Sequence, residues 1–277
     1  MDVKPYVEII RKTGSQARKL FCAYCGAQTP AGSAEGLCSG CESPVYYTLD
    51  EVRATSPAII DVLGRINDAI AKNGYDAASA DYEKLMAGNK DDANLFYVAG
   101  LFYIKYSNYE VSRINYKLPG FMEQNSAQRH RANDLTSKAR LLLNRAVYIS
   151  DAAVAMGNDA LRQTYIRFLC SIKLQKLREA KGSLEKIKGM GDRTLASYAE
   201  LVLRTNAGEY DYVIGRAKEL ISAQDFVPNA AFYLSAALFK KRMYGESEAV
   251  VKALDDQLAT SNVRELLGEI ARAKASF

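Results

Sequence analysis

The sequence predicts a mainly helical protein, built of repeated helix pairs behind a small cysteine-rich segment. From residue 56 onward, apolar residues recur at steps of three and four with very little strand character, which is the spacing of one buried helix face. Within this region, tyrosines that follow turns recur 34 residues apart, at Tyr75 and Tyr109. Four of the five cysteines lie in residues 21–43, FCAYCGAQTPAGSAEGLCSGCES. Together these observations indicate a helical array preceded by a compact module of different construction.

The composition is that of an ordinary globular protein. The chain has 277 residues, of which 48% are hydrophobic and 25% are charged, so extensive disorder is not expected. It contains no run of about 18 uninterrupted apolar residues, as a membrane-spanning helix requires, and residues 1–20 lack the apolar core of a secretion signal. We therefore expect a cytoplasmic protein with no membrane partner, in a compartment where thiols stay reduced.

The cysteine spacing predicts a zinc ribbon in residues 19–49. Cys22 and Cys25 are separated by two residues, twelve residues follow, and Cys38 and Cys41 repeat the two-residue spacing. Such a spacer lets a tight turn direct both thiolates at one ion, and the longer loop brings the second pair round to complete a tetrahedron of sulfurs about 2.3 Å from the metal. Four thiolates leave no position for a substrate, so the expected cofactor is one structural Zn2+. Two disulfides and a rubredoxin-like iron site remain as alternatives.

Short β-prone runs flank the cysteines, with KLFC before the first pair and PVYYTL after the second. These runs are expected to form strands. Gly26 follows the first pair and Gly40 lies within the second, where a turn requires either a positive φ or room for backbone N–H groups to approach sulfur. A ribbon this short cannot bury a core of its own, so metal binding is expected to hold it folded.

Positive charge is concentrated in the middle of the chain. Residues 101–150 carry eight basic and three acidic side chains, a net charge of +5, whereas the ribbon has only Lys19 against Glu35 and Glu42 and is a poor phosphate-binding surface. The pattern favours a solvated helix face. The alternative is a basic patch directed at an acidic protein or RNA. Its candidate residues are Arg113, Lys117, Arg129, Arg131, Lys138, Arg140 and Arg145.

The repeated region resembles the tetratricopeptide family. In that family the first helix carries a large aromatic residue, a small residue four positions later and another aromatic three further on, as Phe96, Gly100 and Tyr103 do here. Residues 75–82 carry the tyrosine, small and bulky residues of its second helix. Weaker copies occur in SKARLLLNRAVYI, REAKGSLEKI, AGEYDYVIGRAKELI and NAAFYLSAALFKKRMYGESEAVVKAL, and NVRELLGEIARAKASF resembles a terminal capping helix.

The resemblance implies a TPR-like α–α solenoid over residues 50–277, with residues 1–18 as an N-terminal arm. Residues 114–138 contain Pro119 and are expected to form an insertion or a lengthened helix, because no ideal repeat contains them. Stacking of neighbouring pairs requires close helix–helix contacts. The small residues expected there are Ala78, Gly100, Ala139, Ala180 and Ala236.

The resemblance also implies that the first helices line a concave surface that binds a protein or peptide. Leu101 and Ala237 stand where family members that clamp a terminal carboxylate have asparagine, so such a clamp is not expected. Tyr165 and Tyr198 fit the core pattern when their register is shifted by one residue. The predicted contact residues are Tyr97, Leu101, Ile104, Lys105, Tyr233, Lys240 and Lys241.

No arrangement of residues typical of an active site is visible in the sequence. The single histidine, His130, lies in an arginine-rich polar stretch, and no Ser/His/Asp set, phosphate loop or dinucleotide fingerprint accompanies it. The fifth cysteine, Cys170, fits a small buried apolar position. We therefore expect no catalytic and no cofactor-binding residues. The sequence favours a non-catalytic adaptor, and the alternative is an RNA- or ribosome-associated factor that uses the patch at 113–145 together with the ribbon.

Overall fold

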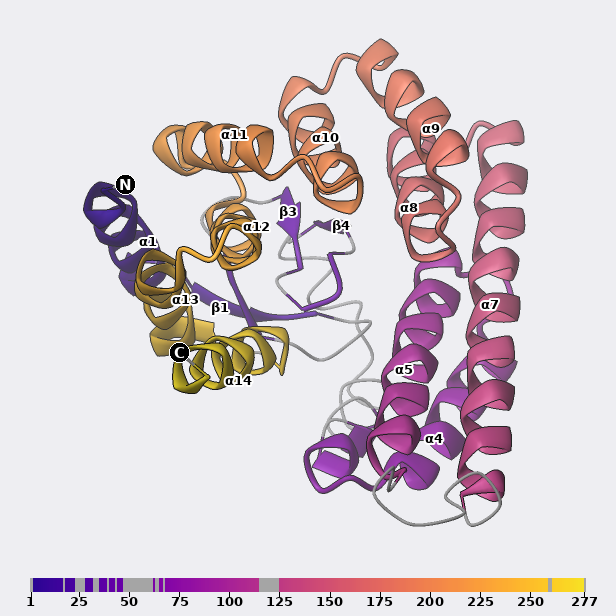
Figure 1. Cartoon of the computed structure of the whole chain (residues 1–277). Helices are drawn as coiled ribbons and strands as arrows, with labels where there is room; N and C mark the ends of the chain where they lie inside the picture. Colours follow the sequence, from indigo (N-terminus) through magenta and orange to yellow (C-terminus); the bar gives the residue numbers. More distant parts are fainter. Residues whose placement is uncertain are drawn as a thin grey trace. The chain divides into compact units, whose positions relative to one another are not determined.

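The protein is mainly helical and divides into two compact units (Figure 1). One unit consists of Pro57–Lys176, and the other joins Met1–Ser56 to Leu177–Phe277. This differs from the expected succession of arm, ribbon and array, because the N-terminal segment packs against the last helices of the chain. The computed structural model describes residues 2–16, 18–22, 28–31, 35–38, 40–42, 44–46, 62, 65–66, 68–114, 125–258 and 261–276.

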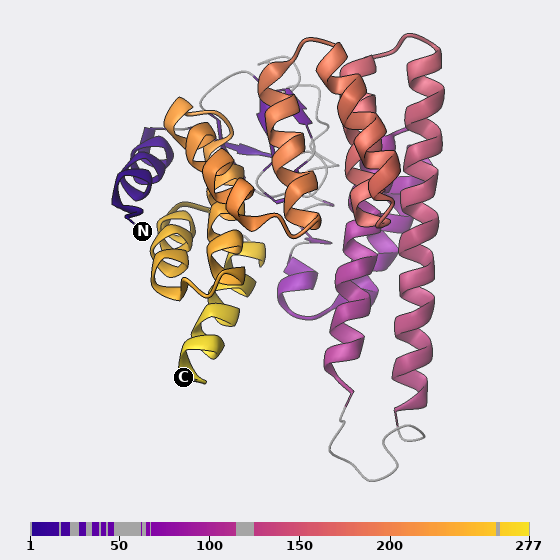
Figure 2. The same cartoon turned by 45° about the horizontal axis from the view of Figure 1, so that its top comes forward.

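Four long helices carry the unit Pro57–Lys176. They are α4 (Tyr75–Gly88), α5 (Ala93–Ser112), α7 (Ser126–Ala155) and α8 (Ala160–Lys173). Helix α5 begins where Asp92 accepts a hydrogen bond from the backbone N–H of Leu95 at 3.2 Å, which satisfies one of the free donors of the first turn. Helices α5 and α7 lie side by side along most of their length (Figure 2). Among the described helices, none combines the length and apolar character needed to cross a membrane.

The irregular region of the repeat pattern is in part a lengthened helix. Helix α7 is 30 residues long and takes in the second half of the segment 114–138 that the sequence singled out. Pro119 and Lys117 lie outside the described residues.

Small residues allow the close approach of α5 and α7. A Cβ atom placed on Gly100 would lie 2.8 Å from Cγ and Cδ2 of Leu143, a side chain that is itself buried. Ala78, Ala139 and Ala180 are also buried, as the repeat pattern predicts. Ala236 is the exception among the expected small contacts.

Helix α12 (Val227–Lys240) is rotated relative to the predicted register. Ala236, which was expected to make a close helix–helix contact, is only partly buried, and so are Phe232 and Phe239 on the same helix. The buried positions are one or two residues further along, at Leu234 and Leu238. The physical reason is that α12 packs on several neighbours at once. They are α10 (Arg193–Asn206), α11 (Tyr210–Ala223), α13 (Tyr244–Leu258) and α14 (Ser261–Ala275). Nearly every position of this apolar helix can therefore be buried, and its spacing does not select one face.

The second unit begins with α1 (Lys4–Gln16), which packs on α11, α12 and α13. Val7 and Ile10 of this helix and Val3 just before it are buried and follow the spacing of one helix face, so the expected N-terminal arm is part of this core. Its remaining helices follow Lys176 in the chain. They are α9 (Leu177–Gly189), α10 (Arg193–Asn206), α11 (Tyr210–Ala223), α12, α13 (Tyr244–Leu258) and α14 (Ser261–Ala275).

The cysteine-rich segment contains two short antiparallel hairpins in its described residues. Strand β1 (Arg18–Phe21) pairs with β2 (Gln28–Ala31), with Arg18 opposite Ala31. Strand β3 (Glu35–Leu37) pairs with β4 (Pro44–Tyr46), with Glu35 opposite Tyr46. The two runs expected to be strands therefore form strands, each in a hairpin of its own.

We expect Gly100→Ala to destabilise the protein by about 1–3 kcal/mol, because the added methyl group overlaps the buried Leu143 side chain. Urea unfolding of the full chain measures the change. Gly88→Ala is the matched control in the same unit, since nothing lies within 4 Å of its Cβ position, and it should cause no loss of stability. Equal stability of Gly100→Ala and the unchanged protein would contradict the close contact.

Candidate functional site

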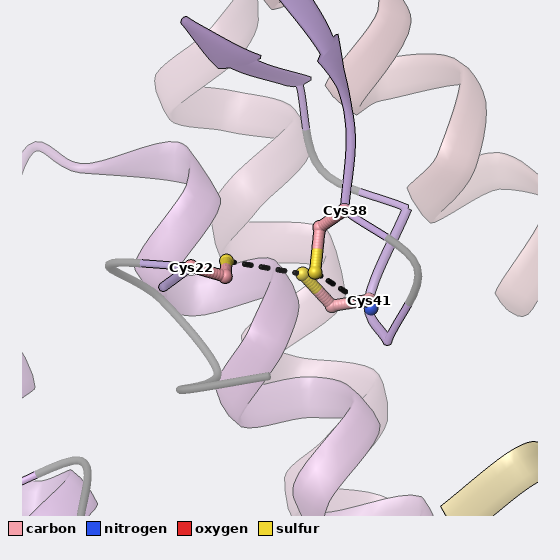
Figure 3. Close-up of side chains that lie close together, drawn as sticks. All are labelled: Cys22, Cys38 and Cys41. Atoms are coloured by element: carbon pink, nitrogen blue, oxygen red, sulfur yellow. Dashed lines mark hydrogen bonds between the residues drawn. The ribbon is translucent and has the colours of Figure 1, made fainter. Parts of the chain in front are cut away.

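Three of the four cysteines in the predicted ribbon meet at one point. Cys22 follows β1, Cys38 follows β3, and Cys41 lies in the turn after it. Their sulfur atoms all lie within 4.8 Å of one another, with 3.9 Å between those of Cys22 and Cys41 (Figure 3). All three side chains are buried. Cys25, the fourth predicted ligand, lies outside the described residues.

The spacing of these sulfurs fits a shared metal ion. Sulfurs bound at about 2.3 Å in a tetrahedron lie roughly 3.8 Å apart, whereas a disulfide would bring two of them to about 2.05 Å. The three cysteines are free thiols, and thiolates in this arrangement are ligands that zinc or iron accepts. The three near cysteines can therefore bind a metal, as the spacing of the sequence predicts.

The turn at the second cysteine pair, Cys38–Glu42, is referred to below as the knuckle. Backbone N–H groups of Gly40 and Cys41 donate to the Cys38 sulfur at 3.3 and 3.5 Å, which favours a negatively charged sulfur. The N–H of Glu42 donates to the Cys38 carbonyl at 2.9 Å and closes the turn. Glu42 has φ of 62°, a left-handed conformation that costs a non-glycine residue about 1–3 kcal/mol. Surrounding contacts must therefore hold this residue in place.

Those contacts come from helices of the same unit. The hydroxyls of Tyr198 on α10 and Tyr233 on α12 both donate to Oε1 of Glu42, at 3.0 and 2.6 Å. The amide of Asn229 donates to the Cys38 carbonyl at 3.2 Å, and that of Asn262 on α14 donates to the Gly40 carbonyl at 3.4 Å. The knuckle is thus hydrogen-bonded to α10, α12 and α14.

Aromatic packing fixes the two tyrosine hydroxyls. The rings of Tyr198 and Tyr233 meet edge to face with centroids 6.0 Å apart, and Phe226 packs edge-on against Tyr198 at 5.5 Å. The exposed fractions of Tyr198 and Tyr233 are 0% and 7%. Rings held in this way keep their hydroxyls directed at one carboxylate oxygen, because rotation of either ring would disturb the packed core.

The sequence pointed to some of these residues and missed others. Tyr198 is buried as expected, and Tyr165 is too. Glu42, Asn229 and Asn262 were not singled out, since polar residues at helix ends and turns are common. The available signal was the recurrence of tyrosine at 198 and 233, 35 residues apart, on two helices that pack together.

The predicted contact residues are divided between core and surface. Tyr97 is fully buried, so a partner cannot reach it, and the expectation that it lines a contact surface is corrected. Tyr97 lies on the buried side of α5. Tyr233 faces the knuckle of its own chain. Leu101, Ile104 and Lys105 are partly exposed, and Lys240 and Lys241 are exposed.

Three cations of the predicted basic patch are paired with acids of neighbouring helices. Arg131 pairs with Asp76 on α4 and with Glu110 on α5. Lys138 pairs with Glu83 on α4. The third cation, Arg113, pairs with Glu110 at 3.3 Å. Much of the positive charge in this part of the sequence therefore joins α7 to α4 and α5.

Hydrogen bonds lower the pKa values of two acids in these pairs. A hydrogen bond from Tyr106, assisted by Arg131, lowers the pKa of Asp76. The hydrogen bond from Lys138 lowers the pKa of Glu83. Both carboxylates are largely exposed, so each pair adds little stability on its own. Their geometry nevertheless directs Arg131 and Lys138 toward the protein.

Three further cations of the patch are on α7, and Arg140 and Arg145 lie close in sequence to exposed apolar residues. Arg129, Arg140 and Arg145 are exposed, and the guanidinium of Arg145 lies 5.3 Å from the ring centre of Tyr148. Leu141, Tyr148 and Met156 are exposed by 69%, 64% and 69%. Residues 141, 145 and 148 follow one another at steps of four and three, near one helix turn, and the C-cap Met156 lies about two turns after Tyr148. They form one face, called the α7 stripe below.

Cys170 on α8 differs from the ribbon cysteines. It is completely buried, and burial strongly raises the pKa of its thiol, so it stays protonated and unreactive. This confirms the expected small buried apolar role. His130 is exposed.

Comparison of the chain with protein-family models, with curated proteins and with solved structures gives no match.

We expect the purified protein to hold one zinc ion per chain and to lose it when Cys22 or Cys38 is changed to serine. Loss of one thiolate opens the sulfur shell, and residues 19–49 should unfold while most of the helical circular dichroism persists. Elemental mass spectrometry measures the metal, and strong visible absorption would instead identify iron.

Cys170→Ala is the control for this experiment, because Cys170 lies in the other compact unit. It should leave the metal content unchanged. A zinc content in Cys38→Ser equal to that of the unchanged protein would contradict the assignment of the site.

Proposed function

We propose that this protein is a non-catalytic adaptor, in which a TPR-like α–α solenoid binds a protein or peptide and a zinc ribbon is attached to it. The observation that carries the proposal is the set of hydrogen bonds that α10, α12 and α14 make to the knuckle. Side chains of these helices donate hydrogen bonds to two backbone carbonyls and one carboxylate. These are the groups by which a helical face holds a polypeptide segment.

The order of the helices supports the solenoid part of the proposal. Successive helices pack together from α9 to α14, and α10 also packs on α12, as α12 does on α14. In a stack of helix pairs, such contacts between alternate helices are made by the helices that share one row. The hydrogen bonds to the knuckle come from this row.

The three buried thiols support the zinc part. A closed shell of thiolates leaves no position for a substrate, so the ion would act by holding the ribbon in shape. Cys25 is the proposed fourth ligand.

The α7 stripe supports a protein as the partner. Large apolar side chains exposed side by side are typical of protein contacts, and the neighbouring Arg140 and Arg145 would suit a helix or extended segment with apolar anchors and acidic residues. Leu101, Ile104, Lys105, Lys240 and Lys241 are proposed as further contact residues on the basis of the family pattern.

An RNA- or ribosome-associated function is the second candidate, because Arg129, Arg140 and Arg145 present exposed positive charge. The pairing of Arg113, Arg131 and Lys138 with acids weighs against it, since binding to a polyanion requires cations free to neutralise phosphates.

We expect Leu141→Ser combined with Tyr148→Ser to weaken capture of the partner by about tenfold or more, because apolar anchors dominate such contacts. Both side chains are exposed, so folding should be retained. The measurement is affinity capture from the native cell with and without nuclease, followed by titration of the captured partner at several salt concentrations.

Tyr212→Ser is the matched control. Tyr212 is an exposed tyrosine on α11 with Arg204 over its ring at 5.3 Å, as Arg145 lies over Tyr148. It should leave capture unchanged. If nuclease abolishes capture, or if affinity falls steeply with salt, the adaptor proposal fails and the RNA candidate replaces it.

A further inference from the structure

Four hydrogen bonds join the face of α10, α12 and α14 to the described residues of the knuckle. They go to the carbonyls of Cys38 and Gly40 and to the carboxylate of Glu42. The side chains of Cys38 and Cys41 turn toward the thiol cluster instead (Figure 3). Since carbonyls are common to all peptides, the one side chain that these hydrogen bonds select is acidic.

We propose that the face formed by Tyr198, Asn229, Tyr233 and Asn262 is a binding surface for a peptide turn that carries a carboxylate. The metal-bound knuckle is its ligand in cis, and loss of the metal opens the face to an acidic turn of another protein. This inference rests on the proposed function, whose binding surface and partner chemistry it specifies.

Every polar contact described at this face is made by a donor of the helices to an acceptor of the knuckle. Two hydroxyls converge on one oxygen of Glu42, and two amides reach carbonyls two residues apart. When the knuckle leaves, these four hydrogen bonds break together. A surface with several preplaced donors is receptive to any turn that offers the same acceptors, because buried donors need a partner.

The shape of the knuckle depends on the metal. Cys38 and Cys41 can share one ion only when the turn between them is tight, and the N–H groups that approach the Cys38 sulfur stabilise it best when it is a thiolate. Glu42 keeps its left-handed conformation at the end of this turn. Without the metal a short ribbon loses its main source of folding energy, and the carbonyls and carboxylate are no longer held in register with the helices.

Docking and metal binding are therefore linked in both directions. If the metal favours docking, docking favours the metal by the same factor. Tyr198 and Tyr233 are buried beneath the knuckle, on helices that supply none of the clustered thiols. An effect of these two tyrosines on zinc affinity would therefore show the linkage.

The first test removes the two hydroxyls and keeps the rings. Tyr198→Phe with Tyr233→Phe should lower the zinc affinity of the full chain by about tenfold or more, measured by competition with a chromogenic chelator. Circular dichroism checks that the helices persist. Tyr212→Phe is the control on an exposed tyrosine and should leave the affinity unchanged.

The second test asks whether the tyrosines act through Glu42. Glu42→Ala should lower zinc affinity as the tyrosine pair does, and the triple variant should lose no more than either, because all three changes break one contact. Additive losses, or the affinity of the unchanged protein in the tyrosine variant, would overturn the linkage.

The third test uses a probe in trans. It is a fluorescent, backbone-cyclised peptide of residues 36–46 with Cys38→Ser and Cys41→Ser. It should bind the metal-free full-length Cys22→Ser protein at least tenfold more tightly than the zinc-loaded unchanged protein, and Glu42→Gln in the peptide should weaken binding. Equal binding to both proteins, or none, would overturn the proposal. Partner capture that persists on the α7 stripe would then show that the adaptor function survives without it.

Discussion

The hydrogen bonds between the knuckle and helices α10, α12 and α14 join distant parts of the sequence into one unit. Tyr198 and Tyr233 reach Glu42 across 156 and 191 residues. The cysteine-rich segment has two small hairpins in its described residues and cannot bury a core of this kind alone. The clustered thiols hold the turns of this segment together, and the tyrosine and asparagine donors attach it to the helices. Met1–Ser56 therefore forms one unit with Leu177–Phe277.

The thiol cluster and the helices have complementary roles in this arrangement. Three buried sulfurs lie within 4.8 Å of one another, a spacing that suits ligation of one metal ion. The helices hold the same turn through carbonyls and a carboxylate. Under the proposed function, one face thus serves both to position the ribbon and to bind a peptide, and the two uses exclude each other.

Charge has a different role in the unit Pro57–Lys176. Arg131 and Lys138 lie in a segment of net positive charge, yet both turn toward acids of α4 and α5. The stripe that remains on α7 combines exposed Leu141 and Tyr148 with Arg145. A surface of this composition suits an amphipathic polypeptide better than a phosphate backbone, because apolar area contributes nothing to neutralising phosphates.

The sequence by itself determined the helices after residue 56, the close contact at Gly100 and the meeting of Cys22, Cys38 and Cys41, because each depends on spacing within a short segment. Only the tertiary structure decided that Tyr97 is buried, that α12 is rotated from its predicted register, and that Arg131 pairs with Asp76 and Glu110. It also decided that Glu42 meets Tyr198 and Tyr233. These outcomes depend on which faces of distant segments come together, and local periodicity carries no information about a neighbour 191 residues away.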